Sequence, residues 1–300
     1  MTQPPYLQKG DTIGLIAPAR KISREEIAFA LNTFSRWGLK TKLGKNLYGA
    51  CNQFSGTDEE RASDMQDMLD DESVKAIISV RGGYGCLRIV DKLDFSRFLK
   101  APKWMIGYSD VTVFHSHLHT MGVETLHATM PFNFGQDAES TESLRRALFG
   151  EVINYTWDSN PLNRKGEASG QLIGGNLSLL YALSGSKSDM DTKYKILFLE
   201  DLDEYLYHID RMMLNLKRSG KLEHLSGLIV GGMTSMKDNT VPFGKTAEEI
   251  ILDAVKEYKY PVCFDFSGGH VPRNLALIFS AEVKLYVAGE SRLHFIGNEK

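Results

Sequence analysis

Residues 104–121 have the sequence WMIGYSDVTVFHSHLHTM. The apolar run Trp104–Gly107 is typical of a buried strand, and Val111–Met121 predicts a helix. A strand that passes directly into a helix is the repeating unit of α/β folds. The segment therefore predicts an α/β domain, with the tight turn Tyr108-Ser109-Asp110 between strand and helix.

The same alternation extends in both directions from this segment. Thr12–Ala17 and Val74–Val80 are short apolar runs that predict buried strands. Capping boxes at residues 23–26 and 57–60 predict the starts of two helices. Val123–His127 predicts a further short strand. The first half of the chain is therefore expected to form a parallel sheet flanked by helices.

The second half has a different pattern, because short strands dominate its end. Between about residues 132 and 170 the periodicity weakens, and no helix or strand is predicted there. Helices are expected after Asn176, around residues 209–216 and after Thr246. Strands are expected at Lys195–Leu199, Leu228–Val230, Val262–Phe264, Leu275–Ser280, Val283–Val287 and Arg292–Ile296. We predict an α/β domain over residues 1–150, a linker over 151–165 and an α+β domain over 166–300.

Composition excludes several classes of protein. The 300 residues carry 35 Lys and Arg against 38 Asp and Glu, a net charge of −3, which argues against a nucleic-acid-binding protein. Charges interrupt every apolar run before it could span a membrane, and no secretory signal is visible, so a cytoplasmic protein is expected. Cys51, Cys86 and Cys263 are an odd number of widely spaced thiols, typical of a reducing compartment. For Cys86, a buried structural thiol is favoured over a nucleophile.

Ser109 is the first candidate for a chemical role. A serine at a sharp strand-to-helix turn presents its hydroxyl outward, beside amides that can stabilise an anion. This position suits a nucleophile, although residue 111 is Val and the segment is not a GxSxG elbow. Considered alone, Ser109 is better explained as a helix N-cap.

The glycine-rich loop Arg81–Gly85 follows the strand Val74–Val80. Consecutive glycines let backbone amides approach a ligand closely, as in an oxyanion hole. The loop lacks the lysine and the third glycine of nucleotide-binding motifs. An oxyanion donor and a structural tight turn are equally good explanations of this loop.

Three further groups could act in acid–base or metal chemistry. Glu200 and Asp201 end a predicted strand, where they could orient a histidine or cap the next helix, and considered alone the capping role is favoured. His270 lies in a glycine-rich loop, a suitable place for a general base, although loop histidines are usually only solvated. His115 and His119 are four residues apart on the predicted helix, but no third ligand is indicated, so a metal site is not expected.

Considered together, these segments resemble the serine peptidases of the LD-carboxypeptidase family, the muramoyl-tetrapeptide carboxypeptidases. The order and approximate spacing of nine segments match along nearly the whole chain. They are Gly10–Ile13, Ala17-Pro18, Gly56–Ala62, Arg81–Gly85, Gly107–Asp110, Gly174–Asn176, Leu199–Asp201, Ile209–Arg211 and Gly269-His270.

The resemblance implies a role for five residues. Ser109 would be the nucleophile, His270 the general base and Glu200 the group that orients His270. The oxyanion hole would consist of the amides of Asp110 and of one glycine of residues 82–83, with Gly83 preferred. No metal and no organic cofactor would be required.

The resemblance also implies a fold and a substrate. The N-terminal domain would be a three-layer α/β domain like that of class I glutamine amidotransferases, and the C-terminal domain an α+β domain of swivelling type. The substrate would be a small peptide, a cytoplasmic murein tetrapeptide, cleaved at the L,D bond to its terminal D-alanine during cell-wall recycling. The alternatives are an immunity-type peptidase that hydrolyses peptidyl or aminoacyl sulfamoyl adenylates, and a ligand-binding protein without catalysis.

Two segments depart from the family pattern. Ala19-Arg20 stands where small hydroxylated residues or glycine are usual, and His127-Ala128 stands where a His-Gly pair is common. Neither touches the expected Ser, His and Glu. The sequence leaves open the residue that binds the substrate's terminal carboxylate, and it leaves a homodimer open.

Overall fold

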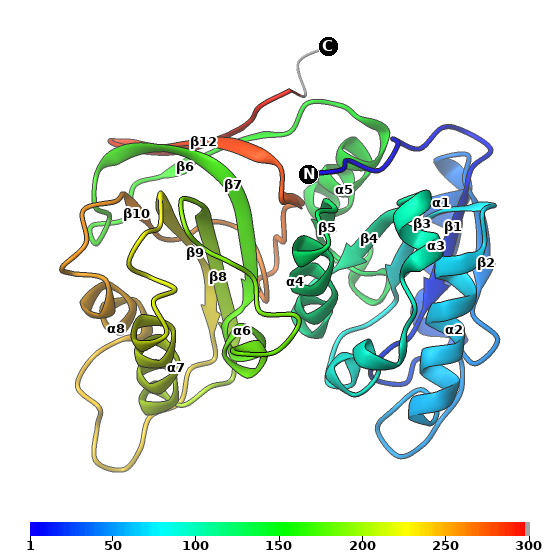
Figure 1. The fold of residues 1–300 in the computed structure, drawn as a ribbon, viewed down its shortest axis with the longest axis horizontal. Coiled ribbons are helices and arrows are strands. Elements are labelled where there is room, and N and C mark those ends of the chain that lie inside the picture. Colours follow the sequence, from blue (N-terminus) through cyan, green and yellow to red (C-terminus); the bar gives the residue numbers. More distant parts are fainter. Residues whose placement is uncertain (298–300) are drawn as a thin grey trace.

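The computed structural model describes residues 1–297, which fold around two β-sheets (Figure 1). The first sheet consists of β1 (Thr12–Ile16), β2 (Lys40–Leu43), β3 (Val74–Ser79), β4 (Trp104–Gly107), β5 (Thr125–His127) and β11 (Leu277–Phe279). Its strand order is β11-β5-β4-β3-β1-β2, and only β11 runs antiparallel to its neighbour. The first sheet is therefore the predicted parallel sheet with two further edge strands, β2 and β11, that were not predicted there.

The second sheet mixes parallel and antiparallel strands. It consists of β6 (Asn154–Asp158), β7 (Gly166–Asn176), β8 (Ile196–Leu202), β9 (Gly227–Thr234), β10 (Val262–Cys263), β12 (Glu282–Val287) and β13 (Glu290–Phe295). Its strand order is β10-β9-β8-β7-β12-β13-β6. The strands from β10 to β7 are mutually parallel, whereas β12, β13 and β6 form an antiparallel extension.

Helices cover both faces of the first sheet and one face of the second. The helices are α1 (Arg24–Arg36), α2 (Asp58–Asp70), α3 (Ser96–Lys100), α4 (Thr112–Thr120), α5 (Ala138–Phe149), α6 (Leu177–Leu183), α7 (Leu206–Arg218) and α8 (Ala247–Ala254). Short 3₁₀ turns lie at Cys86–Arg88, Val90–Lys92, Ser109–Val111 and Pro131–Asn133. The prediction of a two-domain α/β protein is confirmed, while the likeness to glutamine amidotransferases stays a prediction.

Alternation along the strands explains how the layers pack. Ile13 and Leu15 of β1 join the core that includes α1 and α5, whereas Ile16 joins the core that includes α2 and α4. In β8, Leu197 packs with α6, α7 and α8, while Phe198 points into the core that continues into the first domain. The two domains therefore share buried apolar surface, which fixes the position of one against the other.

One strand lies in a different sheet from the one expected. The segment Leu275–Ser280 was expected among the strands of the second domain, but β11 pairs antiparallel with β5 in the first sheet. That prediction is wrong because a three-residue strand carries no signal for its partner. The chain thus returns to the first domain immediately after the His270 loop.

The region from residue 132 to 170 is more regular than expected. Asp137 caps α5 at Ser140, and Gly150 ends the helix in the left-handed conformation, at φ 74°. The expectation of weak structure was wrong here, because the polar residues of α5 and β6 form solvent-facing sides of elements whose apolar sides are buried. β6, which falls within the predicted linker, pairs with β13.

In residues 1–297 no helix is long and apolar enough to cross a membrane.

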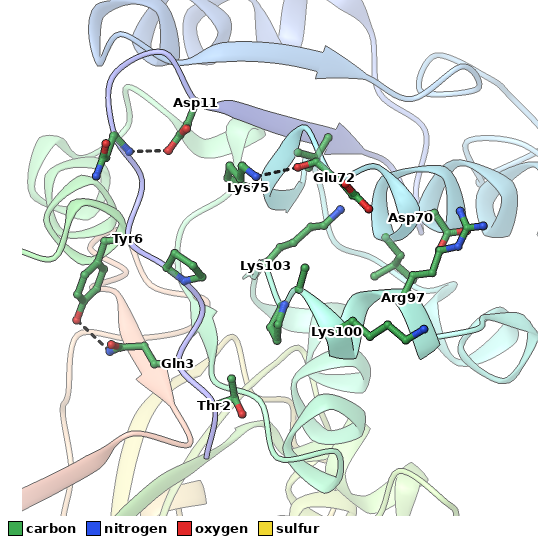
Figure 2. A pocket seen from close by; sticks show the side chains of 16 residues that line it. Thr2, Gln3, Tyr6, Asp11, Asp70, Glu72, Lys75, Arg97, Lys100 and Lys103 are labelled. Carbon is green, nitrogen blue, oxygen red and sulfur yellow. Dashed lines mark hydrogen bonds between the residues drawn. The ribbon is translucent and has the colours of Figure 1, made fainter.

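A hollow of about 960 Å³ opens at the amino ends of β1, β3 and β4 (Figure 2). Its charged lining residues are Asp11, Asp70, Glu72, Lys75, Arg97, Lys100 and Lys103. Lys103 is only 4% exposed, and its Nζ donates to the carbonyls of Met68, at 2.8 Å, and Asp71. Lys103 therefore satisfies backbone carbonyls at the end of α2.

Candidate active site

A second hollow, of about 360 Å³, lies where the two domains meet. The first domain contributes Arg20, the glycine pair 82–83 and Ser109, which follow the carboxyl ends of β1, β3 and β4. The second domain contributes Asn176, Asp201 and His270, from the carboxyl ends of β7, β8 and β10. In open α/β sheets ligands bind at such ends. We refer to this hollow as the cleft.

Ser109 has a strained backbone at the turn after β4. Its φ is 62°, in the left-handed region, and the preceding Gly107 has a φ of 153°. A Cβ on Gly107 would lie 2.7 Å from Val111 Cγ2, so the turn requires glycine there. Tyr108 and Val111, and not Ser109, hold the N-cap positions of the 3₁₀ turn and of α4, so the N-cap explanation is wrong. Strain of this kind concentrates at functional sites, where it fixes the direction of a side chain.

The glycine loop separates Ser109 from Arg20. A Cβ on Gly82 would lie 3.2 Å from Ser109 Oγ, and a Cβ on Gly83 would lie 2.3 Å from Arg20 Cγ. The Arg20 amide donates to the Gly82 carbonyl at 3.4 Å. Because a trans peptide directs its C=O and N–H in opposite directions, the Gly83 amide points away from the Arg20 backbone.

Asp110 is buried directly behind the loop. Its Oδ2 accepts from the Cys86 amide at 2.8 Å, and burial raises the pKa of Asp110 to about 6. Cys86 is fully buried, and burial together with Asp110 raises the pKa of its thiol. A nucleophilic cysteine needs the opposite shift, so the structural role predicted for Cys86 fits its surroundings.

Glu200 and His270 form a close polar pair at the site. His270 Nδ1 lies 2.7 Å from Glu200 Oε2, and the His270 amide donates to the same oxygen at 3.1 Å. Glu200 is completely buried, and a Cβ on Gly269 would lie 2.4 Å from its Cγ. The carboxylate thus binds the histidine loop and caps no helix.

The charge on Glu200 controls the proton affinity of His270. Burial alone would lower the pKa of His270, but the neighbouring carboxylate of Glu200 outweighs burial and raises that pKa. Since a carboxylate only accepts, the proton of neutral His270 resides on Nδ1 and leaves Nε2 free to accept another. The Tyr108 ring lies edge-on to the imidazole, with the two ring centres 5.0 Å apart.

Asp201 faces away from His270 and holds the start of α6. Its carboxylate accepts from Asn176 Nδ2 at 3.0 Å and from the Ser178 amide at 2.9 Å. Burial, followed by the charge of Glu200, raises the pKa of Asp201 to about 7. The prediction that these carboxylates cap the next helix is wrong, because Glu200 contacts His270 and Asp201 contacts the start of α6, the preceding helix.

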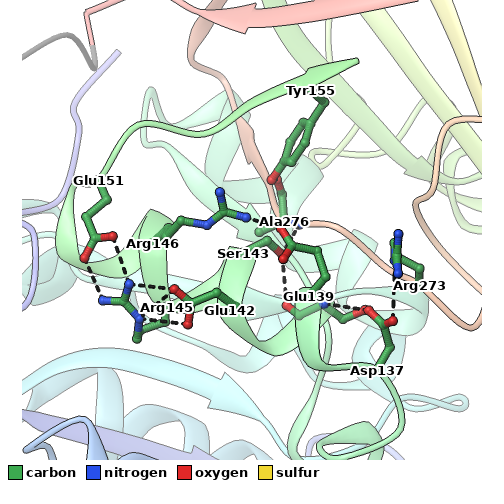
Figure 3. Close-up of polar contacts among 11 residues, drawn as sticks. Asp137, Glu139, Glu142, Ser143, Arg145, Arg146, Glu151, Tyr155, Arg273 and Ala276 are labelled. Atoms are coloured by element: carbon green, nitrogen blue, oxygen red, sulfur yellow. Dashed lines mark hydrogen bonds and ion pairs between the residues drawn. The ribbon is translucent and has the colours of Figure 1, made fainter. Parts of the chain in front are cut away.

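The His270 loop is tied to the first domain just beyond the histidine (Figure 3). The Ala276 amide donates to Ser143 Oγ at 3.0 Å, and Tyr155 donates to the Ala276 carbonyl at 2.7 Å. Arg273 pairs with Asp137 at 3.4 Å. The contacts of Ser143 and Asp137 attach the segment after His270 to α5, and that of Tyr155 attaches it to β6, so the position of the histidine depends on both domains.

The helix histidines have separate partners. His115 contacts Thr125 Oγ1 and the Gly107 carbonyl, both at 2.8 Å, whereas His119 contacts Ser280 Oγ at 2.8 Å. In residues 1–297 no group of three or more metal-binding side chains comes together. His115 therefore supports the turn that carries Ser109.

The structure brings the predicted residues to one place. Gly83, Ser109 and His270 line the cleft, Asp110 follows Ser109, and Glu200 stands behind His270. Their catalytic roles stay a prediction. Sequence reasoning gave no role to three lining residues: Arg20, Tyr108 and Asn176. Each lies inside or beside a matching segment, but nothing in the sequence shows that its side chain faces the cleft.

This architecture defines a two-domain α/β protein with its site between the domains. The sequence profile of the LD-carboxypeptidase N-terminal domain matches residues 13–128, and that of the LD-carboxypeptidase C-terminal domain matches residues 169–285. The chain belongs to the LD-carboxypeptidase family, and it is therefore a peptidase.

Individual relatives match over most of their length. The "Probable murein peptide carboxypeptidase" of Bacillus subtilis is 36% identical over 297 residues, covering 95% of this chain and 92% of the relative. The "Murein tetrapeptide carboxypeptidase" of Pseudomonas aeruginosa is 27% identical and covers 88% and 89%.

Solved structures have the same fold. Muramoyltetrapeptide carboxypeptidase from Oxalobacter formigenes has a TM-score of 0.85 at 25% identity, covering 95% of this chain and 98% of that one. The microcin C7 self-immunity protein MccF has a TM-score of 0.87 at 20% identity, covering 98% of both chains.

Proposed function

We propose that this protein is a serine-type LD-carboxypeptidase that removes the terminal D-alanine from murein tetrapeptides. The observation that carries the proposal is the shared cleft: a strained serine on one domain and a carboxylate-bound histidine on the other line the same hollow. Ser109 is the nucleophile, His270 the general base and Glu200 the group that orients it.

The reaction begins with proton transfer from Ser109 Oγ to His270 Nε2. The serine oxygen forms a bond to the scissile carbonyl carbon, and the carbonyl electrons move onto oxygen. Amides of Gly83 and Asp110 stabilise this oxyanion. The orientation of the Gly82 carbonyl toward Arg20 supports Gly83 as the glycine donor, because its amide then points away from Arg20.

Collapse of the tetrahedral intermediate completes the first half-reaction. The C–N bond breaks, and His270 returns its proton to the departing amine of D-alanine. Water then attacks the acyl-enzyme with His270 again as the base, and Ser109 is regenerated. Glu200 stabilises the imidazolium in both halves and holds its tautomer.

Two relatives whose names refer to murein peptides support the substrate. Such a substrate places the enzyme in the cytoplasm, in cell-wall recycling. MccF keeps the sulfamoyl-adenylate alternative open, but only its fold is shared at this identity. Stacking a purine requires an accessible aromatic side chain. The three tryptophans, Trp37, Trp104 and Trp157, lie outside the cleft lining. Of the aromatic side chains that line it, Tyr108 is buried and Phe132 is already stacked on Arg81, which favours the tetrapeptide.

The test is the release of D-alanine from purified L,D-linked tetrapeptide, with the L,L diastereomer and an aminoacyl sulfamoyl adenylate as comparisons. Inverting the terminal centre exchanges its methyl and carboxylate positions, so the L,L peptide should not be cleaved. The reaction should proceed equally well in EDTA. Equal kcat/KM for the two diastereomers, or faster turnover of the adenylate, would reject this substrate.

A further inference from the structure

An enzyme that removes one terminal residue needs a group that recognises a free carboxylate. In a peptide, the terminal carboxyl carbon lies only about 4 Å from the scissile carbonyl carbon, three bonds away. The recognising group must therefore lie close to Ser109. Arg20 and Arg81 are the two cationic side chains among the described residues that line the cleft.

Arg81 is already engaged. Its Nη1 lies 3.2 Å from Glu26 Oε1, and its guanidinium carbon lies 4.2 Å from the centre of the Phe132 ring. An arginine that is both ion-paired and stacked on an aromatic ring has little freedom to bind a substrate anion.

The Arg20 guanidinium has no such engagement. Its backbone is fixed by the hydrogen bond to Gly82, but the guanidinium makes no hydrogen bond or ion pair with any residue from 1 to 297. Its side chain is exposed. Arg20 therefore presents an unpaired cation with a fork of donors suited to a carboxylate.

The glycine pair sets the distance between Arg20 and Ser109. The side-chain position of Gly82 is within 3.2 Å of Ser109 Oγ, and that of Gly83 is 2.3 Å from Arg20 Cγ. Two consecutive Cα atoms are about 3.8 Å apart. The Arg20 stem thus lies beside Gly83, one residue along the loop from the glycine that contacts the nucleophile, so Arg20 and Ser109 line the same wall of the cleft.

Acidic residues on the second-domain side of the cleft favour one orientation of the substrate. Glu204 and Asp201 line the cleft on the second domain. A free carboxylate is repelled by Glu204 and attracted by Arg20, so the terminal residue is expected on the first-domain side.

We propose that Arg20 binds the terminal carboxylate of the substrate and thereby limits the enzyme to the removal of single residues. This inference rests on the proposed carboxypeptidase function. It also gives a role to the position at which the chain departs from the family pattern. Arg20 acts on specificity, and the chemistry remains with Ser109 and His270.

The kinetic test compares a tetrapeptide that ends in D-alanine with the same peptide ending in D-alanine amide. Wild-type enzyme should prefer the acid, and Arg20→Gln should lower kcat/KM for the acid about 10- to 100-fold while changing the amide little. Arg20→Lys should recover part of the preference. Arg24→Gln is the matched control, because Arg24 stacks on Tyr48 outside the cleft and its loss removes the same charge.

The variant Arg81→Gln distinguishes the contribution of Arg81 to the preference for the acid from that of Arg20. If the preference for the acid disappears in Arg81→Gln and persists in Arg20→Gln, the inference is wrong. An equal loss on acid and amide in Arg20→Gln would also overturn it, because that result indicates a general loss of structure or affinity.

A binding measurement keeps the test independent of turnover. In the Ser109→Ala background, calorimetry should show tighter binding of the acid than of the amide, and Arg20→Gln should remove the difference. If wild-type enzyme cleaves neither peptide but acid binding still depends on Arg20, the proposed function fails and the carboxylate site stands. If Ser109→Ala binds both peptides equally, the carboxylate site is rejected whatever the turnover.

Discussion

The two ends of the first sheet differ in how their polar groups are satisfied. At the amino ends of β1, β3 and β4 lies the hollow of about 960 Å³, where buried Lys103 donates to two backbone carbonyls. At the carboxyl ends lies the cleft of about 360 Å³, with left-handed Ser109 and with Arg20, whose guanidinium pairs with none of residues 1–297. In the larger hollow the buried ammonium group of Lys103 has hydrogen-bond partners, whereas in the smaller hollow the backbone of Ser109 is strained.

The same contrast extends to buried carboxylates near the cleft. Glu200 Oε1 and Asp110 Oδ1 are buried without a hydrogen-bond partner among residues 1–297, and burial raises the pKa of Asp110 to about 6. Unsatisfied polar atoms and strained backbone both cost stability, so they persist where the surrounding structure holds them for another reason. Unsatisfied atoms also occur away from the cleft, at Glu124 Oε2 and Arg164 Nε, so they support this site only together with the strained Ser109 and the Glu200–His270 pair.

The largest expected effect follows from Ser109→Ala. It should reduce kcat at least about 10³-fold, because no other hydroxyl can replace the attacking oxygen. Stability should change by no more than about 1 kcal/mol, because Ser109 holds the N-cap position of neither the 3₁₀ turn nor α4. Turnover of D-alanine release and thermal unfolding test both parts. A variant that keeps a tenth of wild-type turnover would contradict the assignment of the nucleophile.

Glu200→Gln should have the next largest effect, a fall in kcat of about 10²- to 10⁴-fold with a smaller change in KM. The interaction it removes strengthens as His270 becomes an imidazolium, so the loss is mainly in the transition state. Steady-state kinetics on the tetrapeptide measures it. Near-normal kcat would transfer the orienting role to another group, with Asp201 as the nearest candidate.

The pH profile provides an independent readout of the same pair. Glu200 raises the pKa of His270, so the base is neutral only above a higher pH than an ordinary histidine requires. The acid limb of kcat/KM in wild-type enzyme should therefore lie above the usual histidine value of about 6.5. In Glu200→Gln the residual activity should show an acid limb at lower pH. An unchanged limb would mean that another group titrates.

Features that depend on neighbouring residues were predictable from the sequence, whereas the pairing of strands that are distant in the sequence was not. The capping boxes at Ser23, Thr57 and Thr246 are confirmed, because each depends on residues within one turn of helix. The partner of β11 could not be predicted, because β5 lies about 150 residues away and three residues specify no register.

In the candidate site, too, some residues were predictable from local sequence and others were not. The motifs led to Ser109, Glu200 and His270 because each lies in a short segment with a family pattern. The division of work between Glu200 and Asp201 depends on which side of β8 each carboxylate faces, and the role of Arg20 depends on contacts with Gly83. Such contacts between distant segments are visible only in the folded protein.

Gly83→Ala should have an intermediate effect on activity, a loss of about 10- to 100-fold in kcat/KM. A Cβ there would collide with the Arg20 stem, and the backbone φ of 123° disfavours any side chain. Relieving the collision or the backbone strain would move the Gly83 amide, the proposed donor to the oxyanion. The control is Gly122→Ala, which has a φ of 80° and no heavy atom within 4 Å of its added Cβ. Equal kinetic losses in both variants would argue against a special role for the loop.

The smallest effect on activity is expected at the opposite end of the sheet. Lys103→Met should leave kcat and KM within about twofold of wild type but lower the free energy of unfolding by about 2–3 kcal/mol, because two carbonyls lose their donor. Lys75→Met is the matched control. Lys75 is exposed and donates to the Glu72 carbonyl at 2.8 Å, so its loss should cost less than about 0.5 kcal/mol.

The pH dependence of stability sharpens the test of Lys103. Burial lowers the pKa of this lysine to about 8, whereas an unfolded lysine titrates near 10.4. Between about pH 8 and 10 the unfolded chain therefore binds more protons at this residue than the folded chain does, and wild-type stability rises with pH. Lys103→Met lacks this gain, so the stability difference between the two proteins should be larger at pH 10 than at pH 7. Denaturant unfolding at both pH values measures this difference.

A large loss of activity in Lys103→Met at unchanged stability would mean that the amino ends of the strands take part in function. The contrast between the two ends of the sheet would then be wrong.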